Sequence, residues 1–543
     1  MGKNRCRRLL VVLLCWVCLL WAGCENPAVQ ESSEESAAGA VEVSSVIESA
    51  AESAEESAYE VVPSDGILRM TVFMPETLNP LSVQQPEVAQ LLLMIFMPLV
   101  ETDENGVAVE GGLAEEWEVL SDGYQLRLKI RSDVLWQDGT SVSAQDVVYT
   151  LQAFLEESAD HYWKSQLASI TEVALDENGD VRITFSVPVD VDHLGMLVVP
   201  ILPEHIYHVE NPPEWEPIGN GPYQVTEYRA MREIRLTANA QYVGNTPQIQ
   251  EILVEITRSE DAEESAFSQG LTHIIYEEMP SSLSAENIEH HTVYRTDTHE
   301  LQLLYMNQRE GSVLAEENVR KAIMHCIDAQ ELIDRTQIHQ GTCSQSVIPS
   351  WIAECPLPET YPIDYQLAYS LLGENRGASL RLIVSREEQT AIAQARLIYE
   401  QLSQIGLDVQ VILYDEADWQ KALEEGEFDL AFGSCRIDSI QDLSELLASE
   451  GTGNYSGRQD EEMDRLLQNA SSAVGEEART AAYQALSEYA WETLPVCPLY
   501  YSQQAVVVSR DLGGELSPTP YHLYRGIENL LFTSETYSSR NRR

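Results

Sequence analysis

Apolar and polar residues alternate along several short stretches of the chain, and this spacing predicts strands with one buried face. Tyr124–Ile130 (YQLRLKI) and Asp180–Val187 (DVRITFSV) alternate with a period of two, which is the period of side chains along a β-strand. Ile67–Phe73 (ILRMTVF), where the ordered part of the sequence begins, is predicted to be a strand as well. We expect these three ranges to lie in sheets.

Two other stretches space their apolar residues as helices do. Ser143–Glu157 begins with Ser143 as a candidate N-cap and has Asp146 in its first turn, and both features favour a helix start. Glu316–Asp328 predicts an amphipathic helix.

Strand and helix patterns alternate in the second half of the chain. Ala378–Ser385 and Leu407–Tyr414 predict strands, and a helical stretch, 388–406, lies between them. A crossover helix implies that the two strands are parallel. The stretch Trp419–Cys435 repeats this order of helix and strand. The fold class expected from the pattern is therefore α/β.

The first residues have the pattern of a secretion signal. Four basic residues precede Leu9–Trp21, an apolar run of 13 residues, which suits a signal peptide better than a membrane span. Ala22, Gly23 and Cys24 follow and resemble the bacterial lipobox, with Trp21 in place of the usual Leu. We expect Cys24 to be lipidated after removal of residues 1–23. Ordinary secretion with cleavage nearby, or an uncleaved anchor, remain alternatives.

Residues 24–65 are expected to form an acidic, disordered tether. After Cys24 this stretch is rich in Glu, Ser and Ala and contains no Lys or Arg. It has too little apolar surface to order itself, and its like charges repel one another.

Composition limits the kinds of partner. The 543 residues carry a formal net charge of −55, which argues against nucleic acid and against electrostatic binding to an anionic membrane. An apolar content of 44% is enough for real cores, and the length predicts about two to four domains. Five cysteines remain after Cys24, an odd number, and their spacing fits no zinc motif. Cys343 and Cys355 are close enough in sequence to close a short loop.

Several motifs in a fixed order resemble one known family, the extracellular solute-binding proteins of ABC importers, family 5, which includes dipeptide, oligopeptide and nickel binders. The strongest stretch is Gly111–Phe154, with a Leu-Ala-x-x-Trp pattern, an Asp-Gly-Thr turn and a helix that opens with Ala-x-Asp-Val-Val. Pro217–Tyr223 (PIGNGPY) is similar to the family's Gly-Thr-Gly-Pro-Tyr, with Asn220 in place of Thr. Asn239–Ile252 and Ala490–Gln504 continue a resemblance that covers about residues 66–535.

The resemblance implies a periplasmic-binding-protein type II fold, with two main lobes around a ligand cleft and one extra lobe. The expected ranges are 66–98, 203–300 and 500–537 for lobe I, 99–202 for the inserted lobe, and 301–499 for lobe II. Pro217–Tyr223 is expected to be a scaffold element rather than a ligand contact, because Gly and Pro fix a tight backbone there.

The resemblance also implies a carboxylate that receives the α-ammonium of a bound peptide. The matching residue is Asp438, at the end of the apolar run Phe428–Asp438 (FDLAFGSCRID). A buried carboxylate facing an ammonium forms a strong charge-assisted bond. The alternative is that Asp438 caps the following turn. Asp442 is a weaker candidate that suits a helix cap.

Other site residues are transferred from the same family. Arg386, just after the strand Ala378–Ser385, is a candidate for the peptide carboxylate, with Arg436 as a second candidate, because a guanidinium bonds both oxygens. The alternative for Arg386 is a solvated side chain. Tyr305, Asn307 and Asn79 are candidate wall residues, and Tyr305 is equally suited to the core.

The expected function is an extracytoplasmic substrate-binding subunit of an ABC transporter, monomeric and held at the membrane through Cys24. It would capture short peptides and deliver them to permease subunits, without a cofactor. No sequence motif of a hydrolase, metalloprotease or P-loop enzyme is present, so we expect no catalysis. Alternatives are another solute (nickel chelate, haem or sugar) or a peptide-signal receptor. A metal site would need His or Met near Asp438 and Arg386, and neither stretch of sequence offers one.

Overall fold

The computed structural model describes residues 65–533, except 104–105, 121–122, 157–159, 190–193, 208–216, 278–290, 337–340, 351, 354 and 358. These residues belong to one compact unit, Val62–Arg543. The predicted signal peptide, Cys24 and the tether lie outside the described residues. Within the described ranges, no helix is long and apolar enough to span a bilayer.

The centre of the fold is a mixed sheet of 11 strands. Its order is β15 (Asp408–Tyr414), β14 (Ser379–Ser385), β16 (Leu430–Arg436), β12 (Thr292–Met306), β17 (Val496–Val508), β11 (Ile274–Glu277), β1 (Ile67–Phe73), β10 (Glu251–Thr257), β9 (Glu233–Ala238) and β8 (Tyr223–Arg229), with β13 (Gly341–Cys343) also paired to β17.

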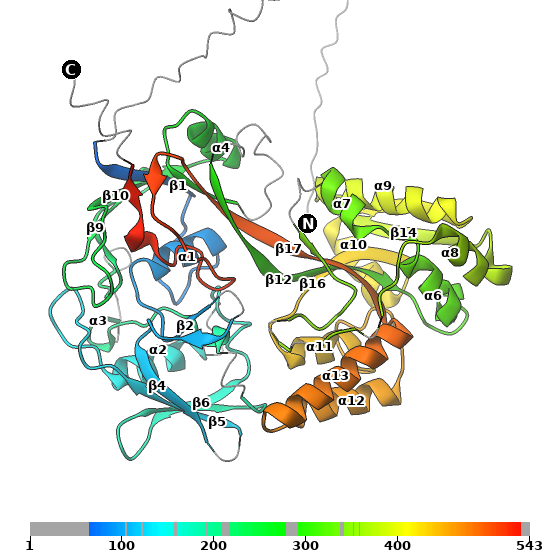
Figure 1. Ribbon diagram of the computed structural model, residues 1–543, viewed down its shortest axis with the longest axis horizontal. Helices are drawn as coiled ribbons and strands as arrows, with labels where there is room; N and C mark the ends of the chain where they lie inside the picture. Colours follow the sequence, from blue (N-terminus) through cyan, green and yellow to red (C-terminus); the bar gives the residue numbers. More distant parts are fainter. Residues whose placement is uncertain are drawn as a thin grey trace, which may run out of the picture. The chain divides into compact units, whose positions relative to one another are not determined.

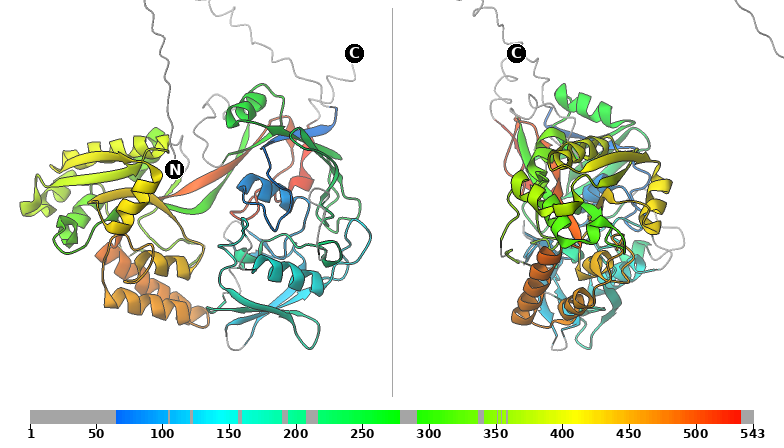
Figure 2. Two further views of the ribbon diagram at one scale, coloured as in Figure 1. Left: turned by 180° about the vertical axis from the view of Figure 1, so that it is seen from behind. Right: turned by 90° about the vertical axis from the view of Figure 1, so that its right-hand side faces the viewer.

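Two long antiparallel strands, β12 and β17, connect the two halves of this sheet and run side by side in Figures 1 and 2. Their register is interrupted between Asp297 and Leu301 of β12. On one side of this bulge β12 pairs only with β17, and from Glu300 onward it also pairs with β16. A bulge bends a strand and re-aims its side chains, so this is the point where the two halves of the sheet meet.

The predicted βαβ unit is present. Strands β14 and β15 are parallel, α9 (Gln389–Gln404) connects them, and β16 pairs with β14 in the same direction after α10 (Glu416–Glu425). Leu382 and Ile383, neighbours in β14, lie in different hydrophobic cores. The strand is thus buried on both faces, as its continuous apolar run requires.

Residues 114–185 contain a second, antiparallel sheet. Its order is β4 (Ala114–Val119), β5 (Gln125–Ile130), β7 (Val181–Phe185) and β6 (Ile170–Leu175), and α2 (Ala144–Phe154) packs on β6 and β7. Ser143 caps α2 as predicted, because Asp146 and Ser143 exchange hydrogen bonds in a capping box. This sheet shares one hydrophobic core with β1 and β10.

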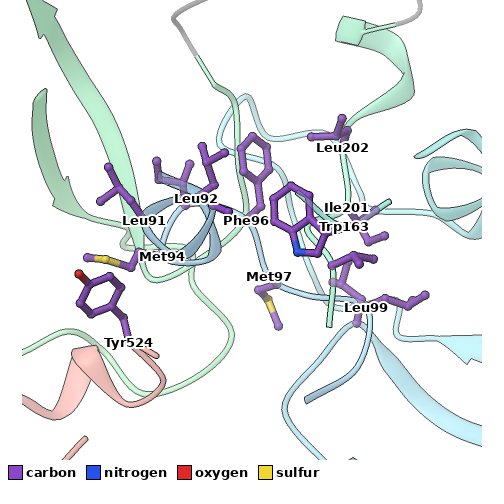
Figure 3. Close-up of a cluster of buried hydrophobic side chains, with 14 of the residues drawn as sticks. Leu91, Leu92, Met94, Phe96, Met97, Leu99, Trp163, Ile201, Leu202 and Tyr524 are labelled. Atoms are coloured by element: carbon purple, nitrogen blue, oxygen red, sulfur yellow. The ribbon is translucent and has the colours of Figure 1, made fainter. Parts of the chain in front are cut away.

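The segment that leaves α1 (Pro86–Leu93) carries this shared core between the two sheets. Figure 3 shows Leu91 and Met94 near Tyr524, and Phe96 beside Trp163 and Ile201. The Gly-rich loop before β8 packs against the same segment, where Asn220 and Gly221 donate backbone hydrogen bonds to the Ile95 carbonyl. A Cβ on Gly219 would lie 2.0 Å from that carbonyl oxygen, so the loop is a scaffold element.

The remaining helices and short strands surround these sheets. They are α3 (Glu204–Tyr207), α4 (Glu260–Ser268), α6 (Glu317–Met324), α7 (Ala329–Thr336), α8 (Tyr365–Leu371), α11 (Ile440–Leu447), α12 (Glu461–Ser472), α13 (Glu476–Thr493), β2 (Glu101–Thr102), β3 (Ala108–Val109), β18 (Leu512–Gly513) and β19 (Leu531–Phe532).

Candidate ligand site

Asp438 follows the end of β16, between that strand and α11. The chain stays tied to the sheet there, because the Ile437 N–H donates to the His299 carbonyl at 2.8 Å. The cap of α11 is made by Asp442, whose Oδ2 accepts hydrogen bonds from the N–H and hydroxyl of Ser439, both at 2.9 Å. Capping is therefore the role of Asp442, and the carboxylate of Asp438 is available for other partners.

The Asp438 carboxylate is buried and ionised. Its side chain is 8% exposed, its Oδ1 lies 2.5 Å from Nδ1 of His299, and its Oδ2 accepts from Nε of Arg436 at 2.6 Å. Burial alone would raise the pKa of Asp438, but the hydrogen bond and charge of His299, with those of Arg436, hold it well below its ordinary value.

His299 reaches Asp438 because it lies in the bulge of β12. The ring is buried, and Tyr521 packs edge-on against it with ring centroids 4.8 Å apart. The neighbouring Thr298 hydroxyl donates to the Ser502 carbonyl at 2.9 Å, which fixes the bulge to β17. The bulge thus positions the imidazole that orients the carboxylate.

Asp438 lines a cavity of about 100 Å³ between residues of the predicted inserted lobe and residues of lobe II. The lining residues are Gly106, Gln166, Ser169, Phe185, Val187, Pro188, Val189, Met196, Ile352, Asp438, Ser439, Ile440, Gln441, Arg479, Tyr483 and Tyr521. Its walls are largely apolar, with a carboxylate, a guanidinium and hydroxyl groups placed among them, the composition typical of a ligand pocket.

Two hydrogen bonds join the two sides of this cavity. Nε2 of Gln441 donates to the Ser186 hydroxyl at 3.5 Å, and a guanidinium nitrogen of Arg479 donates to the Val189 carbonyl at 3.3 Å. Both contacts are polar and long, and Val187 adds apolar packing against the core that contains Ile440 and Tyr483.

Arg436 is joined to Asp438 but also reaches solvent. Its side chain is 46% exposed. Burial would lower its pKa, but the charge of Asp438 and the hydrogen bond to it raise the pKa above its ordinary value. Arg436 therefore remains charged beside the cavity and serves to orient Asp438.

Arg386 is placed elsewhere. Its side chain is 53% exposed, its Nε lies 3.1 Å from a carboxylate oxygen of Asp415, and another guanidinium nitrogen donates to the Leu413 carbonyl at 3.0 Å. Arg386 is not one of the described residues that line the Asp438 cavity.

The three predicted wall residues make contacts within the fold itself. Tyr305 is 3% exposed within a hydrophobic core, and its hydroxyl donates to the Ser434 carbonyl at 3.4 Å. The amide nitrogen of Asn307 donates to the Gly426 and Phe428 carbonyls. Asn79 forms an Asx turn by accepting from the Leu81 N–H at 3.1 Å. None of these three residues is among the described residues that line the Asp438 cavity.

Sequence reasoning missed His299, Tyr521 and Met196, because the stretches of sequence around Asp438 contain no His or Met and the fold brings these residues in from elsewhere in the chain. His299 is 139 positions from Asp438 in the chain, and Met196 lies on the opposite wall of the cavity. One signal was available for His299, which stands in a polar break just before the apolar run LQLLYM.

The structure gives no support for a metal site or a disulfide in the part of the chain that it describes. No group of three or more His, Cys, Asp or Glu side chains there is arranged to hold a metal ion. Cys326, Cys343, Cys355, Cys435 and Cys497 are all free thiols, so the loop closure considered for Cys343 and Cys355 is not present.

Comparison with known proteins identifies the family. The model of "Bacterial extracellular solute-binding proteins, family 5 Middle" matches residues 108–457. The chain belongs to this family. Family 5 consists of solute-binding proteins, and the expected class of protein is confirmed.

Individual relatives in family 5 are distant in sequence and similar in fold. Oligopeptide-binding protein AppA of Bacillus subtilis is 22% identical over 485 residues, which cover 80% of this chain and 85% of that protein. Heme-binding protein A of Haemophilus influenzae is 23% identical over 481 residues, 80% of this chain and 86% of that protein. The structure of HbpA2 from Haemophilus parasuis matches with a TM-score of 0.74 at 20% identity, over 86% of this chain and 99% of that one. The periplasmic-binding-protein type II fold is thereby confirmed.

Proposed function

We propose that this family 5 protein is the substrate-binding subunit of an ABC transporter and that it captures short peptides with Asp438 as the receptor for the α-ammonium group. The observation that carries the proposal is the ionised Asp438 carboxylate, 8% exposed, in the wall of a cavity between two parts of the chain. The names of relatives such as oligopeptide-binding protein AppA support the choice of peptide as ligand.

The partners of Asp438 leave room for a ligand. A carboxylate has about four lone-pair positions, and His299 and Arg436 each occupy one. An ammonium group can therefore approach the remaining positions while the two protein contacts stay in place. Those contacts fix the orientation and the charge of the carboxylate before the ligand arrives, which reduces the cost of binding.

The size of the cavity suits one end of a peptide. A volume of about 100 Å³ accommodates an amino group and the first residue, whereas sites for whole drug-sized ligands measure roughly 300–1,000 Å³. Apolar walls such as Phe185 and Val189 exclude water around the charge, and this strengthens an ammonium–carboxylate bond. Haem is bound by a relative according to its name, but a haem is too large for this volume.

We further propose that the ranges 66–98, 203–300 and 500–537 act as lobe I, 99–202 as the inserted lobe and 301–499 as lobe II, with a hinge at the bulge of β12. The register break between Asp297 and Leu301 supports a hinge, because irregular strand pairing bends more easily than a regular ladder. Since His299 lies in this bulge, hinge bending and the orientation of Asp438 would be coupled.

The proposed location is the outer face of the cytoplasmic membrane, with Cys24 as the lipid anchor and the acidic stretch 25–65 as a tether. The lipobox-like sequence before Cys24 supports this. A monomeric, non-catalytic protein would then deliver peptide to membrane permease subunits. Metabolic labelling with a fatty acid tests the anchor, and a Cys24→Ser variant that is still labelled would refute it.

The proposed ligand end is tested with a pair of peptides that differ only in the amino terminus. A free tripeptide should stabilise the folded protein by RT ln(1 + [L]/Kd) and thereby raise its melting temperature. Its N-acetylated form has no ammonium and should give little or no shift. Equal shifts from both peptides would show that Asp438 does not receive the amino terminus.

A further inference from the structure

The cavity beside Asp438 presents apolar walls to the first residue of a bound peptide. One wall contains Phe185, Val189 and Met196 of the predicted inserted lobe, and the facing wall contains Ile440 and Tyr483 of the predicted lobe II. Met196 is half-buried, and the other four are 4–7% exposed. A ligand group between these walls is removed from water on both sides, which favours an apolar group.

Several polar groups of the lining are directed to the protein itself. The amide nitrogen of Gln166 donates to the Met196 carbonyl at 3.3 Å, and the Ser169 hydroxyl donates to Sδ of Met196 at 3.8 Å. The Ser439 hydroxyl donates to the carboxylate of Asp442 at 2.9 Å. A polar side chain of the ligand would lose its water and compete for these partners, so it is disfavoured.

Charged side chains on the first residue are disfavoured as well. The Asp438 carboxylate lines the cavity and would repel an acidic side chain. Arg479 lines it too, but its guanidinium donates to the Val189 carbonyl on the opposite wall at 3.3 Å, so an acidic side chain would compete with a contact that joins the two sides. A basic side chain would be repelled by the same guanidinium and would compete with the α-ammonium group for Asp438.

The size of the cavity is limited, because the backbone of one wall is fixed. Gly195, directly before Met196, lies against the ring of Tyr521, and a Cβ at Gly195 would lie 2.1 Å from a carbon of that ring. The cavity volume is about 100 Å³, whereas an apolar protein cavity of roughly 150 Å³ holds one benzene ring. The space therefore suits the side chain of valine or leucine and is too small for an aromatic ring.

We propose that the Asp438 cavity selects peptides whose first residue has a branched aliphatic side chain, such as valine or leucine, and discriminates against aromatic and charged first residues. This selection rests on the proposed function, because the side chain reaches the apolar walls only if Asp438 holds the amino terminus. Met196 limits the size of the side chain, since it lines the cavity and its sulfur accepts from the Ser169 hydroxyl. Later residues of the peptide lie outside this cavity and are not selected by it.

Isothermal titration with tripeptides that differ only in the first residue tests the proposal. The series is Val-Ala-Ala, Leu-Ala-Ala, Ala-Ala-Ala, Phe-Ala-Ala and Glu-Ala-Ala. We expect Val-Ala-Ala and Leu-Ala-Ala to bind about tenfold or more tightly than Ala-Ala-Ala, because each buried methylene group raises the affinity about fourfold. Phe-Ala-Ala and Glu-Ala-Ala should bind more weakly than Ala-Ala-Ala.

Met196→Ala tests the residue that limits the size. The variant enlarges the cavity at a half-buried position, outside the fully buried core. The affinity for Phe-Ala-Ala should then rise about tenfold or more, and the affinity for Val-Ala-Ala should fall, since its side chain loses contacts with one wall. Met231→Ala is the matched control, because Met231 is 57% exposed in the turn between β8 and β9 and is not among the described lining residues. It should leave both affinities unchanged.

The outcomes separate selection by the cavity from the proposed function. If all the tripeptides bind with dissociation constants within about threefold of one another, the peptide function stands and selection by the cavity is wrong. The same conclusion follows if Phe-Ala-Ala or Glu-Ala-Ala binds most tightly, or if Met196→Ala leaves the ratio of the Phe-Ala-Ala and Val-Ala-Ala affinities unchanged. If no tripeptide binds, the proposed function itself fails, and the selection fails with it.

Discussion

Replacement of Asp438 by asparagine changes the charge at the proposed peptide site with almost no change in volume. The new side-chain amide must direct its oxygen to the Arg436 guanidinium, because that group is only a donor. Its NH₂ group then faces Nδ1 of His299, which is 2.5 Å from Oδ1 in the unmodified protein. His299 accepts this hydrogen bond only as the tautomer with its proton on Nε2. Both contacts therefore survive without a charge on residue 438, and we expect the variant to fold.

The expected loss is in ligand binding. The unmodified site offers an ammonium group a charge-assisted hydrogen bond, worth about 1.5–3 kcal/mol, in a cavity with largely apolar walls. The variant offers the peptide only an amide oxygen that already accepts from Arg436, beside a guanidinium that is no longer neutralised. The dissociation constant of a free tripeptide should thus rise by about ten- to 150-fold.

Isothermal titration with free and N-acetylated tripeptides measures this loss. The variant should lose affinity for the free peptide and bind the acetylated peptide as weakly as the unmodified protein does. Asp408→Asn is the matched control, because Asp408 is an exposed carboxylate on β15 in the same lobe. If Asp438→Asn binds the free peptide as tightly as the unmodified protein, the assignment of the amino-terminal receptor is wrong.

Three further outcomes follow from the same contacts. The pKa of Asp438 is lowered in the folded protein, so its contribution to stability is present above the unfolded pKa of about 3.9 and declines as the pH falls below it. Urea unfolding should therefore show that the stability difference between the unmodified protein and Asp438→Asn shrinks from pH 7 to pH 3. A constant difference would contradict this. Gly219→Ala should lower stability by about 3 kcal/mol or more, because the new Cβ would lie 2.0 Å from the Ile95 carbonyl oxygen; a thermal melt within a degree of the unmodified protein would refute the tight packing. Arg386→Ala should change the unfolding free energy by less than about 1 kcal/mol, since the ion pair of Arg386 with Asp415 is exposed. It should also leave tripeptide affinity unchanged, whereas a tenfold loss of affinity would restore Arg386 as the carboxylate receptor.

The site could be predicted only in part. Asp438 was assigned by resemblance to the family, and its place at the end of the apolar run that forms β16 is a local pattern of the sequence. The competing role, a helix cap, belongs to Asp442, the residue that the sequence suggested for it. Tyr305 and Asn307 were assigned by resemblance, but Tyr305 packs in a hydrophobic core and the Asn307 amide donates to backbone carbonyls.

The sequence by itself determined the elements and the family. Strands such as β1 and β7, helix α2 with its Ser143 cap, and the parallel βαβ unit follow from periodicity and capping, which depend on residues a few positions apart. Several motifs in a fixed order along the chain, with Gly111–Phe154 as the strongest stretch, indicated family 5.

Only the tertiary structure decided which groups meet. His299 contacts Asp438 because a bulge in β12 re-aims it, and Glu101 meets His522 across 421 positions of sequence. Neither pairing leaves a local pattern, since register and packing between distant strands set the positions of these side chains. The physical reason is that burial and hydrogen-bond partners, which fix the charge of a carboxylate, are properties of the assembled chain.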